Sequence, residues 1–162
     1  MNKVFRGFLL TLLVSGLLAL AGCGGGEQVK PQPTPGGDAG GSVITHDQAV
    51  ALLKNNPIYF AFDRYDLDSA ARADLQAKAD LLNKYTDIKV QISGHCDSRG
   101  TDEYNLALGE RRARAAYDYL LMLGVKPAQL STHSYGKMYP AVQGNTEAAW
   151  NKNRRDEFNV GY

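Results

Sequence analysis

Side chains able to bind a ligand are concentrated in residues 94–113, GHCDSRGTDEYNLALGERRA. This segment follows an alternating apolar run and leads into a long amphipathic stretch, so we expect it to join the end of a strand to the start of a helix. Loops in this position are common ligand sites in open α/β sheets, because the free N–H groups of the helix favour a carboxylate. Asp97 and Arg99 lie in the expected loop. Thr101 or Asp102 is expected to cap the helix.

One stripe of that helix is polar and borders the expected core. At roughly 100° per residue, the stripe contains Thr101, Asn105, Leu108 and Arg112. The neighbouring apolar stripe, which is expected to face the sheet, contains Leu106, Ala113, Ala116 and Leu120. Helical side chains lean toward the N-terminus, so Arg112 is expected to reach back toward the loop. With Asp97 it would offer an anion and a forked cation, which suits a ligand that has both an ammonium and a carboxylate group.

Purely structural interpretations of the charged residues stay open. Asp97 could hydrogen-bond only the turn that follows it. Arg111 and Arg114 are expected to belong to a solvated face, where ion pairs contribute little to stability. Arg154 and Arg155, near the C-terminus, are expected to be structural or rim charges without a ligand role.

His95, Cys96 and Asp97 are adjacent, which could suggest a metal site or a thiol nucleophile. Consecutive residues of a strand point to alternate faces, however, and rarely converge on one ion or one reacting atom. His46 and His133 lack the short spacings of zinc motifs. We therefore expect no metal, no cofactor and no catalytic residue, and we expect Cys96 to be a buried, inert thiol.

The remaining sequence predicts the elements that position this loop. Apolar and aromatic runs predict strands at 58–62, 89–93, 131–135 and 156–160. Helical periodicity predicts helices at 47–55, 69–84, 102–123 and 146–153. Their expected end residues are Ser69 as an N-cap, Asn145 or Thr146 as another, and Gly124 as a C-terminal stop. The order predicts an α/β fold, an α+β sandwich with helices on a mixed sheet whose last strand could run antiparallel.

The N-terminus has the pattern of a secretory signal. Lys3 and Arg6 precede an apolar run at 8–20, which is shorter than the roughly 20 residues that span a bilayer. The letters LAGC at 20–23 resemble the bacterial lipobox, so Cys23 is expected to carry a covalent lipid. A plain cleaved signal with an incidental cysteine is the alternative.

Three parts of the chain follow from these patterns: a signal peptide at 1–22, the lipidated Cys23 with a Gly- and Pro-rich linker at 23–42, and one folded domain at 43–162. The linker has only Val29 as a large apolar side chain, so it is expected to be a flexible tether. Without the signal peptide, 16 basic and 17 acidic residues remain. Such a nearly neutral chain is not expected to bind nucleic acid.

Residues 58–162 resemble the OmpA-like peptidoglycan-binding domain, and within that family the Pal lipoproteins of the Tol-Pal system. The resemblance is carried by IYFAFDRYDL at 58–67, GHCDSRGTDEYNLALGERRA at 94–113, STHSYGK at 131–137 and NKNRR at 151–155. It implies that Asp97 takes the ammonium and Arg112 the carboxylate of diaminopimelate in the peptidoglycan stem peptide. It also implies a pocket lined by Asp63, Arg99, Thr101, Asn105 and Leu108. Asp63 could instead only end its strand, and Cys96 replaces the more frequent Thr, as in many Pal sequences.

The implied function is a tether, not an enzyme: an outer-membrane lipoprotein whose periplasmic domain holds the cell wall and supports envelope integrity and cell division. The residue after the expected lipidated Cys23 is Gly24, whereas an Asp at this position is associated with retention of lipoproteins in the inner membrane. The resemblance therefore implies sorting to the outer membrane. Implied partners are peptidoglycan and TolB, with TolA as a further candidate. A peptidoglycan-processing enzyme and a lipoprotein that mainly recruits proteins stay open as alternatives. For the tether, Asp97→Ala or Arg112→Ala is expected to abolish retention on sacculi with the thermal melt nearly unchanged.

Overall fold

The computed structural model describes residues 43–161, so the predicted signal peptide, Cys23 and the linker lie outside the described residues. The helices are α1 (His46–Asn55), α2 (Ser69–Lys84), α3 (Asp102–Met122), α4 (Glu147–Asn153) and a short 3-10 helix, η1 (Pro127–Gln129). The strands are β1 (Ile58–Tyr59), β2 (Val90–His95), β3 (Leu130–Gly136) and β4 (Arg155–Val160). None of these helices is both long and apolar enough to cross a bilayer.

The strands form one mixed sheet in the order β1-β4-β2-β3. Strands β2 and β3 are parallel, whereas β4 is antiparallel to both of its neighbours. The expected mixed sheet and the antiparallel last strand are therefore confirmed. Because β4 lies between β1 and β2, the C-terminal segment of the domain reaches the middle of the sheet and brings the residues just before it to the end of β2.

Hydroxyl and carboxylate side chains begin the helices by accepting from free backbone N–H groups. Thr101 and not Asp102 caps α3, and Thr146 and not Asn145 caps α4. The cap of α2 is Asp68 and not Ser69 as predicted, because the Asp68 carboxylate binds the third N–H of the helix and Ser69 is already helical. Gly124 follows α3 with a φ of 90°, the left-handed conformation in which glycine commonly ends a helix.

Strand β1 is shorter than predicted, since only its first two residues pair in the sheet. The sequence that follows is as apolar as a strand, but its backbone turns away. The carbonyl groups of Ala61 and Arg64 accept hydrogen bonds from the Arg112 guanidinium at 3.2 and 2.8 Å instead of joining a ladder. A buried arginine therefore replaces the end of a strand and holds a loop beside β2.

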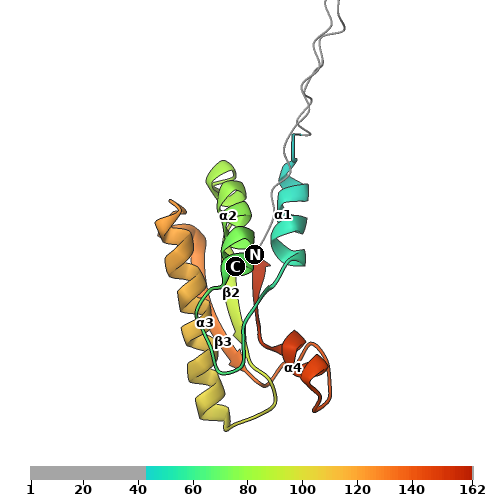
Figure 1. Ribbon diagram of the computed structural model, residues 1–162. Helices are drawn as coiled ribbons and strands as arrows, with labels where there is room; N and C mark the ends of the chain where they lie inside the picture. Colours follow the sequence, from blue (N-terminus) through green and yellow to red (C-terminus); the bar gives the residue numbers. More distant parts are fainter. Residues whose placement is uncertain (1–42, 162) are drawn as a thin grey trace, which may run out of the picture. The chain divides into compact units, whose positions relative to one another are not determined.

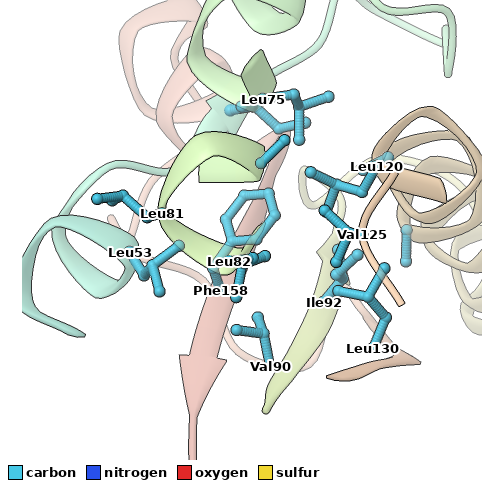
Figure 2. Packing of buried hydrophobic residues seen from close by; sticks show 14 of the residues in the cluster. Leu53, Leu75, Leu81, Leu82, Val90, Ile92, Leu120, Val125, Leu130 and Phe158 are labelled. Atoms are coloured by element: carbon cyan, nitrogen blue, oxygen red, sulfur yellow. The ribbon is translucent and has the colours of Figure 1, made fainter. Parts of the chain in front are cut away.

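The apolar core lies between one face of the sheet and helices α1, α2 and α3, which Figure 1 shows on the same side. Leu82, Val90, Ile92 and Phe158 are fully buried at its centre (Figure 2). Helix α3 contributes Ala113, Ala116 and Leu120, as predicted from its apolar stripe. Leu106 was assigned to the same stripe, but 37% of it is exposed. The helix is rotated so that Asn105 and Gly109, and not Leu106, face the sheet.

Two glycines decide this rotation by letting α3 touch the sheet backbone. A Cβ on Gly94 of β2 would lie 2.0 Å from the carbonyl oxygen of Gly109, and a Cβ on Gly109 would lie 2.3 Å from Ser134 Oγ. A Cβ at Gly94 would therefore require the backbone of α3 to move, and a Cβ at Gly109 would require the Ser134 side chain to move. The start of α3 is therefore held directly against the end of β2, where the ligand-binding loop was predicted.

Candidate functional site

A cavity of about 170 Å³ lies beside the C-terminal end of β2. Figure 1 shows the start of α3 and helix α4 at this end of the sheet. Six of the seven residues predicted for the pocket line the cavity: Asp63, Asp97, Arg99, Asn105, Leu108 and Arg112. Thr101 is absent from the lining, because its hydroxyl caps α3 and accepts from the Tyr104 N–H. The other lining residues are Phe62, Cys96, Gly100, Tyr104 and Arg154.

Asp97 is the buried anion of the cavity, with 5% of its surface exposed. Its Oδ1 accepts from the Arg99 backbone N–H and from Arg99 Nε, both at 3.1 Å. Its Oδ2 accepts from Arg99 Nη2 at 2.6 Å and from Arg154 Nη1 at 3.3 Å. Burial alone would raise the pKa of Asp97, but the hydrogen bonds from Arg99 and Arg154 outweigh it and hold the pKa below its usual value. The carboxylate is therefore ionised at neutral pH.

The Arg99 guanidinium lies between two aromatic rings. Its Cζ is 4.0 Å from the centre of the Phe62 ring and 3.9 Å from that of Trp150. Such cation–π contacts leave the edges of the guanidinium group free for hydrogen bonds. Two of those edge atoms, Nε and Nη2, donate to the Asp97 carboxylate. Arg99 and Asp97 therefore form an ion pair in the lining of the cavity.

Arg154 is the residue that the sequence interpretation missed. It is 4% exposed and donates to the Phe60 carbonyl, Glu147, Asn151 and Asp97, so it is a wall of the cavity and not a rim charge. Arg154 directly precedes β4, which begins at Arg155, and neighbouring residues at a strand end point to opposite faces. That alternation was the available signal that the two arginines lie on different sides, and only Arg154 lines this cavity.

Arg112 reaches back from α3 as predicted, but most of its donors are already used. Its side chain is fully buried and donates to three backbone carbonyls, those of Ala61, Arg64 and His95, and to Cys96 Sγ. These hydrogen bonds use four of the five N–H groups of a guanidinium. The expected forked donor is thus a buried cation with one N–H group left over, and burial lowers its pKa from the ordinary arginine value.

The opposite rim is formed by Asp63 and by α3. Asp63 has a φ of 57°, a backbone conformation that residues other than glycine rarely adopt, and its carboxylate accepts from the Tyr104 hydroxyl. Asn105 is buried and donates to the carbonyls of Arg99 and Thr101 at 2.6 and 3.0 Å. These bonds brace the loop against the helix, while Leu108 supplies an apolar surface. Strained backbone of this kind is frequent at binding sites.

Cys96 is a buried free thiol, as predicted. Burial raises its pKa to about 11, which keeps the sulfur protonated at neutral pH. His95 points to the other face of the sheet, where it lines a separate hollow with Glu157. Burial and the nearby Arg155 lower the pKa of His95 to about 4. In residues 43–161, no three His, Cys, Asp or Glu side chains gather where they could hold a metal ion.

Comparison with known proteins identifies the family of this chain. The model of the OmpA family matches residues 59–154. A peptidoglycan-associated lipoprotein of Pasteurella multocida is 43% identical over 145 residues, which covers 89% of this chain and 92% of the relative. One from Haemophilus influenzae is 41% identical over 156 residues, covering 96% of this chain and 97% of the relative.

Solved structures show the same fold. The crystal structure of the peptidoglycan-associated lipoprotein from Burkholderia pseudomallei has a TM-score of 0.64 and 41% identity, and the match covers 65% of this chain and 89% of that chain. The C-terminal domain of Helicobacter pylori MotB has a TM-score of 0.62 at 22% identity, with 66% of this chain and 84% of that chain covered. The second likeness concerns the fold alone.

Proposed function

This chain belongs to the OmpA family and, within it, to the peptidoglycan-associated lipoproteins, and from this membership we propose that it is an outer-membrane lipoprotein whose domain binds peptidoglycan without a covalent bond. The names of its relatives support peptidoglycan as the ligand, and the cavity beside β2 supports the location of the binding site. Asp97 and Arg112, which were predicted from different elements, line one cavity. This shared lining is the observation that carries the proposal.

The ligand we propose is the zwitterionic end of diaminopimelate in the stem peptide. Its ammonium binds the Asp97 carboxylate, which stays ionised at neutral pH. Its carboxylate is attracted by Arg112 and Arg154, whose buried guanidinium groups line the same cavity. An interior of lower dielectric strengthens both attractions relative to water. Peptidoglycan with lysine in place of diaminopimelate lacks the distal carboxylate and is expected to bind more weakly.

The cavity residues suit binding better than hydrolysis. A glycosidase or peptidase of the carboxylate type needs an acid that is protonated near neutral pH, whereas the pKa of Asp97 is held low. A thiol hydrolase needs a thiolate, whereas the pKa of Cys96 is about 11. We therefore favour a tether over a peptidoglycan-processing enzyme.

Residues 1–42 complete the proposed tether. Lipid on Cys23 would anchor the chain, and the linker of Gly and Pro residues could span on the order of 20 to 50 Å. The resemblance to Pal lipoproteins supports TolB as a partner of the domain, with TolA as a further candidate. Competition between TolB and peptidoglycan for the domain would then release the wall during division.

Retention on purified sacculi tests the proposal. The Asp97→Asn variant of the full-length lipoprotein, in detergent, should bind diaminopimelate-type sacculi roughly thirtyfold more weakly, because a charge-assisted hydrogen bond is lost. Asp118→Asn is the matched control: Asp118 also pairs with an arginine, Arg114, but is absent from the lining. Equal retention of both variants would contradict the proposal.

Arg112→Ala is less suitable for this test, although the sequence predicts that it abolishes retention on sacculi. From the structure we expect this variant to melt at a lower temperature, because removal of the guanidinium leaves the carbonyl groups of Ala61, Arg64 and His95 without their donor. Each unpaired buried group costs about 1 to 3 kcal/mol. A loss of binding by Arg112→Ala would therefore report a loss of stability as well.

A further inference from the structure

The Asp97 carboxylate is already saturated with donors. A carboxylate has about four acceptor positions. In the described residues, Arg99 fills three of them, one with its backbone N–H and two with its guanidinium, and Arg154 fills the fourth. A ligand ammonium can therefore reach Asp97 only if one of these donors leaves.

The two arginines differ in how firmly they are held. Arg154 has a side chain that is 5% exposed, and it also binds Phe60, Glu147 and Asn151. The side chain of Arg99 is 32% exposed, and within residues 43–161 its guanidinium donates to Asp97 alone. Moving Arg154 would break its hydrogen bonds to Phe60, Glu147 and Asn151 inside the domain. Moving Arg99 breaks its pair with Asp97 and its contacts with the Phe62 and Trp150 rings, but the guanidinium can then be hydrated by solvent. Arg99 is the donor that gives way.

We propose that the Arg99 side chain is an internal stand-in for the ligand ammonium, which it must yield when the ligand enters. This inference rests on the proposed binding of a diaminopimelate ammonium by Asp97. Binding is then an exchange of one cation for another at the same carboxylate. The exchange lowers affinity, because the ligand must replace an existing ion pair. It also raises specificity, because a neutral group gains nothing from Asp97 that offsets the lost pair.

Removal of the Arg99 guanidinium should strengthen binding. Arg99→Met keeps a long apolar side chain between Phe62 and Trp150 and keeps the backbone N–H that binds Asp97. The full-length Arg99→Met lipoprotein should bind a soluble muropeptide with a diaminopimelate stem roughly fivefold more tightly than the wild type, measured by calorimetry. Arg111→Met is the matched control, since Arg111 also lies over aromatic rings but is absent from the lining.

A second measurement reads the displacement in the wild type. Trp150 is the single tryptophan of the chain and contacts the Arg99 guanidinium. When Arg99 leaves, one face of the indole is uncovered, so acrylamide should quench Trp150 fluorescence more strongly after the muropeptide is added. In Arg99→Met, the same addition should change the quenching little.

The outcomes separate this inference from the proposed function. Tighter binding by Arg99→Met, together with increased quenching in the wild type, supports the exchange. Unchanged or weaker binding by Arg99→Met overturns it, and if Asp97→Asn still loses the muropeptide, the proposed function stands. If Asp97→Asn binds as well as the wild type, both proposals fall. If Arg99→Met does not fold, unchanged quenching in the wild type is by itself enough to overturn the exchange.

Discussion

Asp156 is an unusual residue of the core, because its carboxylate is fully buried and neither oxygen has a hydrogen-bond partner among the described residues. It lies in β4 opposite Gly94. Burial raises the pKa of Asp156 well above its usual value, although the charges of Arg112 and Arg155 oppose the shift. Near neutral pH, the domain therefore bears the free-energy cost of either protonating this carboxyl or burying its charge.

Replacing Asp156 by asparagine should stabilise the domain in a pH-dependent way. A raised carboxyl pKa means that the folded state binds a proton more readily than the unfolded state, so wild-type stability falls as pH rises from about 4 toward the folded pKa. Asp156→Asn has no such loss. Its melting temperature should match that of the wild type near pH 4 and exceed it near pH 7, by the equivalent of about 1 kcal/mol.

Thermal melts at both pH values, with Asp118→Asn as an exposed control, decide this prediction. If Asp156→Asn were less stable than the wild type at pH 7, Asp156 would be ionised and stabilised by Arg112 and Arg155. The Asp156 carboxylate would then stabilise the folded domain by compensating the charges of these two arginines.

At the scale of elements, the site depends on the contact between α3 and β2. The contact brings Asn105 and Arg112, from the helix, to the loop that carries Asp97. It is possible only because Gly94 and Gly109 have no side chains. The loop, the helix and the strand thus form one unit whose geometry is decided by a backbone contact.

Gly94→Ala should therefore be strongly destabilising. The added Cβ would lie 2.0 Å from the Gly109 carbonyl oxygen, and backbone atoms cannot turn aside as a flexible side chain can. We expect a loss of about 3 kcal/mol in the free energy of unfolding, measured with urea. Exposed Ala107 of α3 supplies the comparison, because Ala107→Gly should cost only about 1 kcal/mol through helix propensity. A Gly94→Ala variant as stable as the wild type would show that α3 can shift away from the sheet.

At the scale of the whole molecule, the proposed tether has two independent attachments, a lipid and a folded domain. Cys23→Ser should separate them, because a hydroxyl does not replace the acylated thiol. The variant is expected to leave the membrane fraction and to keep its retention on purified sacculi. Fractionation of cells followed by sacculus sedimentation measures both, and mass spectrometry of the mature N-terminus of the wild type identifies the lipid. A Cys23→Ser variant that stays with membranes would contradict the anchor.

The sequence by itself determined the elements and most of the lining of the cavity. Periodicity and capping residues are local properties, so α2, α3 and β2 were predicted within a few residues of their observed ends. Asp97 and Arg112 were expected in one place because a strand, a loop and a helix that follow each other in the chain must stay adjacent. Local signals failed where a distant partner takes over the backbone, as Arg112 does at the end of β1.

Only the tertiary structure decided which donors are free. Arg154 is distant in the sequence from Asp97, and it reaches the cavity because β4 inserts between β1 and β2. Arg112 is occupied by carbonyl groups of a loop 48 and 51 residues earlier in the chain. The type of a side chain determines how many hydrogen bonds it can donate. How many of those donors stay free for a ligand depends on which acceptor groups the fold brings within hydrogen-bonding distance.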